Sequence, residues 1–124
     1  MATMRVGLVA PDREVWTGEA EIVVARTLDG DIGVLPGHAP LLGVLAEGGV
    51  VRIRPEGGDD IVAAVDGGFL SVSSDGVSVL GEFVQLADEI DTGAVRRELD
   101  RARSEEDEQA VKRLEGRLRA AGEE

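Results

Sequence analysis

Residues 30–42 read GDIGVLPGHAPLL, and this stretch decides the fold prediction. It predicts a short strand, a rigid turn and a second apolar run. Pro36 and Pro40 fix the backbone angle φ on either side of Gly37. We therefore expect His38 to stand at a stiff loop tip between two strands. Taken alone, the spacing favours an ordinary Pro-Gly hairpin with a solvated histidine.

The sequence on both sides of this stretch, over about residues 1–86, has the pattern of a β-sheet protein. Residues 60–65 are almost continuously apolar, which is typical of a strand buried on both faces. Val77 and Val79 alternate with Ser78, which indicates a half-exposed strand. Glycine-containing turn signals separate the runs, at Asp29-Gly30, Gly48-Gly49, Glu56-Gly57-Gly58, Asp66-Gly67-Gly68 and Asp75-Gly76. We predict a flattened β-barrel or two-sheet sandwich of about eight to ten strands.

The composition changes near residue 90. Residues 1–90 hold five basic and fifteen acidic side chains, a net charge of −10, whereas residues 91–124 hold eight and ten, a net charge of −2. The later segment shows helical periodicity, with apolar residues at Val95, Leu99 and Ala102, and then at Val111, Leu114, Leu118 and Ala121. The predicted fold class is therefore β followed by α, with an antiparallel two-helix hairpin over residues 91–124.

The helix ends are predicted from capping residues. Asp91 or Thr92 would cap the first helix, and Ser104 with the acidic residues 105–107 would form the turn and the acidic first turn of the second. Gly116 is expected to lower the stability of the second helix by ~1 kcal/mol relative to alanine. Helices of this length are marginal alone in water, so a partner or ligand could decide the conformation of the hairpin.

Composition excludes several classes of protein. The net charge of −12 argues against a nucleic-acid reader or a binder of anionic lipid, and no apolar run is long enough for direct membrane insertion. The absence of cysteine and the single histidine exclude cysteine-zinc and multi-histidine metal sites. We predict no catalytic residue, because His38 has no nucleophile partner and the chain has no P-loop. Acidic pairs such as Asp59 and Asp60 are interpreted as turn residues rather than calcium ligands.

The stretch GDIGVLPGHAPLL, together with LVAPDREVWTGEAEIVVARTLDG before it and VAAVDGGFLSVSSDGVSVL after it, resembles the epsilon subunits of F-type ATP synthases. The resemblance covers nearly the whole chain. It implies a non-catalytic rotor subunit that couples proton-driven rotation to ATP synthesis. Such a subunit would be a peripheral membrane protein at the cytoplasmic face of the bacterial plasma membrane. The sandwich of residues 1–86 would bind the gamma subunit and the c ring, through Asp31, Pro36, Gly37, His38 and Pro40. Phe69 is interpreted as a core residue.

The hairpin carries eight basic residues, and a solvated helix face beside nearby acids is their simplest interpretation. The resemblance implies more: a regulatory hairpin that extends along gamma, meets the catalytic alpha and beta subunits and restrains ATP hydrolysis. The implied contact residues are Arg96, Arg97, Arg101, Arg103, Lys112, Arg113, Arg117 and Arg119.

Some members of that family bind ATP through Ile-Asp-x-x-Arg-Ala and two arginines four residues apart. Here Ile90, Asp91, Arg113 and Arg117 match, but Ala94 and Val95 stand where arginine and alanine would be. The resemblance therefore implies at most weak ATP binding and no other cofactor.

Three alternatives stay open from the residues alone. They are a nucleotide-sensing module, a free-standing carbohydrate- or peptide-binding sandwich, and a small hydrolase. The scarcity of aromatic residues weakens the second, and the lack of a catalytic constellation weakens the third.

Overall fold

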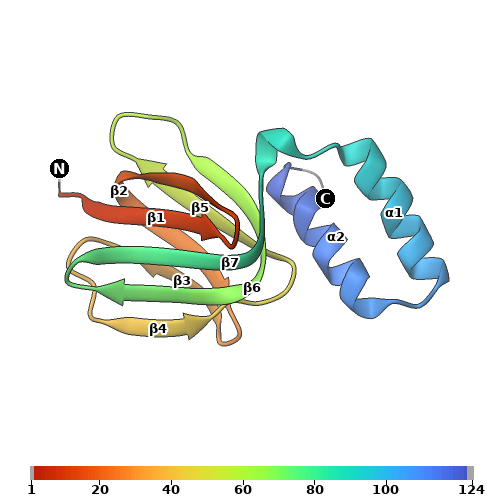
Figure 1. The fold of residues 1–124 in the computed structure, drawn as a ribbon, viewed down its shortest axis with the longest axis horizontal. Coiled ribbons are helices and arrows are strands. Elements are labelled where there is room, and N and C mark those ends of the chain that lie inside the picture. Colours follow the sequence, from red (N-terminus) through yellow and green to blue (C-terminus); the bar gives the residue numbers. More distant parts are fainter. Residues whose placement is uncertain (1, 123–124) are drawn as a thin grey trace.

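The computed structural model describes residues 2–122 and places a twisted sheet beside a pair of helices (Figure 1). Met1, Glu123 and Glu124, which end the two predicted segments, lie outside the described residues. The strands are β1 (Met4–Ala10), β2 (Arg13–Thr27), β3 (Gly30–Val34), β4 (Leu41–Val44), β5 (Gly49–Pro55), β6 (Ile61–Ser73) and β7 (Gly76–Leu86). A 3₁₀ turn (Ala87–Glu89) leads to α1 (Thr92–Ser104) and α2 (Glu108–Ala120).

The sheet closes on itself. Its strand order is β1-β7-β6-β5-β2-β3, with β1 also paired to β2 and β4 paired to β6. All pairings between these strands are antiparallel except that of β1 with β7, which is parallel. The predicted sandwich followed by a helical hairpin is confirmed.

The described residues form seven strands, where eight to ten were expected, because the long strands serve both layers. The first part of β2 pairs with β1, and its second part pairs with β3 and β5. Similarly, β6 pairs with β5 through residues 61–65 and with β4 through residues 69–72. A single strand that bends from one layer into the other replaces two shorter ones.

The prediction of a turn at Asp66-Gly67-Gly68 is wrong, since these residues lie inside β6 at the point where its partner changes from β5 to β4. Gly67 and Gly68 have φ values of 70° and 111°, which L side chains rarely adopt. A Cβ atom on Gly68 would run into the carbonyl oxygen of Leu80 on β7. The glycines therefore permit a bulge and a close strand pairing rather than a chain reversal.

The sandwich core is built from aliphatic side chains, with Leu8, Ile53 and Leu70 among the largest that are fully buried. Neighbouring residues Ala63 and Ala64 point to opposite faces of β6, yet both are buried. Helix α2 packs on β5 and β6, which accounts for burial of the outer face. The prediction that residues 60–65 include a strand buried on both sides is therefore confirmed for its centre.

The helices have their own core, formed by Val95, Leu99, Ala102, Leu114 and Leu118. Asp91 caps α1, and its carboxylate accepts a hydrogen bond of 3.1 Å from the amide of Ala94. Asp107 caps α2 in the same way, so Glu105 and Glu106 belong to the turn between the helices. The predicted turn is present, but the prediction that these residues form the first turn of the second helix is wrong. Within residues 2–122, no helix is long and apolar enough to cross a membrane.

Candidate functional site

The predicted stiff loop is a tight turn that follows β3. The amide of His38 donates to the carbonyl of Leu35 at 3.0 Å, with Pro36 and Gly37 at the two central positions. Gly37 has a φ of 84°, and proline followed by a residue of positive φ is the pattern of a type II turn. The His38 ring is half-buried, with Nδ1 2.7 Å from the carbonyl oxygen of Ala39. The histidine is thus held by the turn and is less exposed than a solvated tip.

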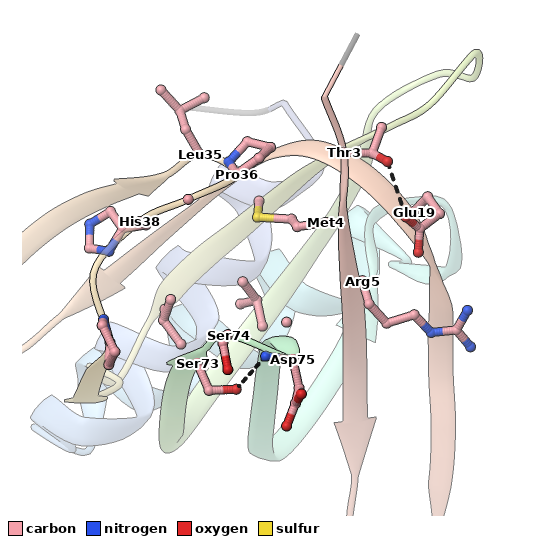
Figure 2. A pocket seen from close by; sticks show the side chains of 15 residues that line it. Thr3, Met4, Arg5, Glu19, Leu35, Pro36, His38, Ser73, Ser74 and Asp75 are labelled. Carbon is pink, nitrogen blue, oxygen red and sulfur yellow. Dashed lines mark hydrogen bonds between the residues drawn. The ribbon is translucent and has the colours of Figure 1, made fainter.

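This turn borders an open hollow of about 500 Å³ (Figure 2). The other walls come from the start of β1 and from the tight turn between β6 and β7. Two hydrogen bonds tie its polar rim together: Thr3 Oγ1 donates to Glu19 at 3.0 Å, and the amide of Asp75 donates to Ser73 Oγ at 3.2 Å. Pro36, Gly37, His38 and Pro40, four of the five predicted rotor-contact residues, line this one hollow.

Asp31, the fifth predicted residue, is not among the lining residues of the hollow. It lies at the opposite end of β3 and forms a two-point ion pair with Arg26, with distances of 2.8 and 3.1 Å. The hydrogen bond from Arg26 lowers the pKa of the Asp31 carboxyl. Asp31 shares a shallow depression with Gly48 and Arg119, next to the helices.

An outward-facing apolar row crosses strands β4, β6, β7 and β1. Val44 on β4 lies opposite Phe69 on β6, Phe69 lies opposite Leu80 on β7, and Leu80 lies opposite Val9 on β1. The first three are 46%, 50% and 47% exposed, and Leu42, two residues before Val44, is 71% exposed. We call these five residues the apolar row.

The interpretation of Phe69 as a core residue is wrong, because it is half exposed in this row. Each member of the row looks like an ordinary strand residue in the sequence. Only the strand register places them side by side, so no local signal could have revealed the surface.

A buried polar contact joins the hairpin to the sandwich. Arg117 on α2 pairs with Asp66 on β6 at 3.2 Å, and their side chains are 14% and 5% exposed. The other Asp66 oxygen accepts from the amide of Gly48 at 2.8 Å, and the carbonyl of Gly48 accepts from Arg119 at 2.6 Å. The Arg117 guanidinium lies 4.3 Å from the centre of the Phe83 ring. Among residues 2–122, no buried side-chain nitrogen or oxygen lacks a hydrogen-bond partner, and this contact follows that rule.

Burial raises the pKa of the Asp66 carboxyl above its ordinary value. The Gly48 amide and the charges of Arg117 and Arg113 oppose that rise without cancelling it. The ion pair thus offsets only part of the desolvation of the carboxylate.

Gly116 has a role that its helix propensity does not reveal. A Cβ atom there would lie 2.5 Å from the carbonyl oxygen of Gly48 and 2.6 Å from its Cα. Gly116 is therefore required for α2 to approach the turn between β4 and β5. Glycine lowers the stability of the helix, as expected from the sequence. It also permits this close packing, which the sequence did not indicate.

The eight basic residues of the hairpin do not form one continuous row. Arg117 and Arg119 contact the sandwich, and Arg113 lies close enough to affect Asp66. Arg103 joins α1 to α2 through Glu115 at 3.3 Å. The others, all on exposed positions, are Arg96, Arg97, Arg101 and Lys112.

Three of the four residues predicted for weak ATP binding have roles inside the chain. Asp91 caps α1, Ile90 packs against the helical core, and Arg117 pairs with Asp66. Arg113, the fourth, is half-buried on α2 near Asp66.

Comparison with known proteins agrees with this architecture. Residues 3–87 match the family model of the ATP synthase delta/epsilon chain β-sandwich domain. The ATP synthase epsilon chain of Streptomyces avermitilis is 56% identical over 119 residues, covering 96% of this chain and 95% of that protein. The epsilon chain of Rhodococcus opacus is 50% identical over 120 residues, covering 97% of each.

A solved structure of Euglena gracilis mitochondrial ATP synthase, comprising OSCP, F1 and the c-ring, contains a similar chain. It superposes with a TM-score of 0.85 at 26% identity, over 98% of this chain and 82% of that one. The fold of the chain and the relatives that it matches therefore indicate the same family. The protein belongs to the epsilon-chain family of ATP synthases, whose members are non-catalytic subunits of the complex.

Proposed function

We propose that this chain is a rotor subunit that links the c ring to gamma, so that proton-driven rotation reaches the catalytic subunits. The apolar row is the observation that supports this most directly. Large exposed apolar patches on a chain with a net charge of −12 mark contact surfaces. Gamma is the partner proposed for the row.

The turn of residues 35–40 is proposed to contact the c ring. Leu35 is 57% exposed at its start, and two prolines with one tight hydrogen bond hold the backbone. A surface that is already ordered loses little conformational entropy on binding. Such a turn suits a contact that must transmit torque.

The hairpin is proposed to restrain ATP hydrolysis by contacting the alpha and beta subunits when it leaves the sandwich. The exposed arginines of α1 would meet carboxylates there, because guanidinium groups bind carboxylates at two points. We also propose that docking of the hairpin needs no ATP, since Asp66 already neutralises Arg117. The complex would place this chain at the cytoplasmic face of the membrane, peripheral to it.

Replacing Phe69 with glutamate is expected to weaken binding to a gamma-containing rotor by at least about tenfold, because a charge in the centre of an apolar interface loses its hydration. Binding of the labelled chain to a catalytic sector depleted of its own epsilon subunit measures this. The control Gln109→Glu adds the same charge at an exposed position of α2. Equal affinity of both variants would remove the row from the interface.

The proposed function is tested with the same depleted sector, by adding the full chain or a version ending at Asp91. Binding and the rate of ATP hydrolysis are recorded together. We expect both versions to bind and only the full chain to slow hydrolysis. Binding without inhibition by either would refute the regulatory role, and failure of both folded versions to bind would refute the rotor role.

A further inference from the structure

The closest attachment of the hairpin to the sandwich involves α2 from Lys112 to Arg119, about two helical turns. Gly116, Arg117 and Arg119 follow one another on α2 and meet Gly48 and Asp66. Gly48 lies in the turn before β5, and Asp66 lies at the bend of β6. One small area thus joins two elements of the sandwich to one helix.

The two parts of the molecule have separate apolar cores. The buried residues of the sandwich and those of the helices form distinct clusters, and α1 packs mainly on α2. In Figure 1, α1 lies on the side of α2 away from the sheet. The helices could therefore separate from the sandwich together, keeping both cores intact.

The two charged side chains at the centre of the attachment are largely buried. Removing one partner of a buried ion pair leaves a charge without compensation, whereas removing both can be nearly neutral. Desolvation of Asp66 raises its pKa and offsets part of the attraction between the two charges. A docked position of α2 in which Arg117 does not contact Asp66 would leave a buried charge without a partner, and it is therefore strongly disfavoured. The pair therefore selects one docked position.

We propose that Asp66 and Arg117 form a latch that holds the hairpin against the sandwich, and that parting of this pair releases α1 and α2 as one unit. Gly116 and Gly48 provide the close approach that brings the two charges together. This inference goes beyond the proposed function, since it concerns the isolated chain and needs no other subunit.

The test measures the distance between the hairpin and the sandwich in the full chain. The chain has no cysteine, so two cysteines placed at exposed Glu56 and Glu98 can be spin-labelled without background. Pulsed electron paramagnetic resonance then measures the distance between the two labels, and the distance distribution gives the populations of docked and released hairpin. The variants are Asp66→Asn, Arg117→Met and the double variant. Arg101→Met is the matched control, because it removes an exposed positive charge from α1, away from the sandwich.

We expect Arg117→Met to raise the released population by at least about tenfold, because Asp66 is left buried without its counter-charge. Asp66→Asn should raise the released population by a smaller factor, since Arg117 is more exposed than Asp66 and keeps its contact with the Phe83 ring. The double variant should be less open than Arg117→Met, and the control should match the wild type.

Wild-type distances in both single variants would overturn the latch. So would a double variant whose opening is the product of the two single effects, because independent residues do not couple. Trp16, the only tryptophan, lies on β2 and reports whether the sandwich is folded. If Arg117→Met unfolds the sandwich, comparison of Asp66→Asn with the double variant decides the question.

Discussion

Alanine at Gly68 is expected to lower the free energy of unfolding of the sandwich by roughly 3 kcal/mol or more. The residue has a φ of 111°, and a Cβ atom would run into the Leu80 carbonyl. Because that oxygen belongs to the neighbouring strand β7, relief requires β6 and β7 to separate. Urea unfolding followed by Trp16 fluorescence measures the loss.

Gly33→Ala is the matched control for this substitution. Gly33 also lies in a strand, but its φ is not positive and no atom lies within 4 Å of the added Cβ. Its midpoint of unfolding should stay at the wild-type value or rise slightly. A Gly68→Ala midpoint equal to that of Gly33→Ala would contradict the close pairing of β6 and β7.

Alanine at Gly116 is expected to undock the hairpin while making α2 a better helix. Alanine favours a helix by ~1 kcal/mol over glycine, but overpacking against a rigid backbone costs about 1–3 kcal/mol. Here the obstacle is the backbone of Gly48, which cannot rotate away as a side chain would. Amide exchange at Gly48 should accelerate because the region around it opens to water, whereas exchange inside α2 should not.

Gly93→Ala separates the two effects. Gly93 is in α1, where an added Cβ meets only ordinary contacts at 3.5 Å. This variant should gain helix stability and keep the hairpin docked. If Gly116→Ala behaves like Gly93→Ala, with protected exchange at Gly48, the close approach of α2 to the sandwich is refuted.

Much of the fold could be predicted from the sequence because its signals are local. The i, i+4, i+7 spacing of Val95, Leu99 and Ala102 identified the buried face of α1, and all three are buried. The alternation of Val77, Ser78 and Val79 likewise identified the inner face of β7. Periodicity is set within one element, so no knowledge of its neighbours is needed.

Features that depend on two distant segments could not be predicted. Asp66 followed by two glycines has the composition of a turn, and only the pairing of β6 with both β5 and β4 shows that it is a bend. Gly116 looked like a helix defect until Gly48 was placed beside it. Phe69 looked buried until the register put it on the outer face. The turn of residues 35–40 was predictable, but its separation from Asp31 was not.

The parallel pairing of β1 with β7 has a consequence for synthesis of the protein. Val6 lies opposite Val77, so β1 must wait for β7 before its second edge is paired. Contacts between segments so far apart in the chain form slowly, and an unpaired edge invites association with other chains. On the ribosome, β1 and β2 can form a hairpin early, but the barrel closes only after β7 has emerged. The helices follow directly, and they reach a sandwich whose docking surface is already complete.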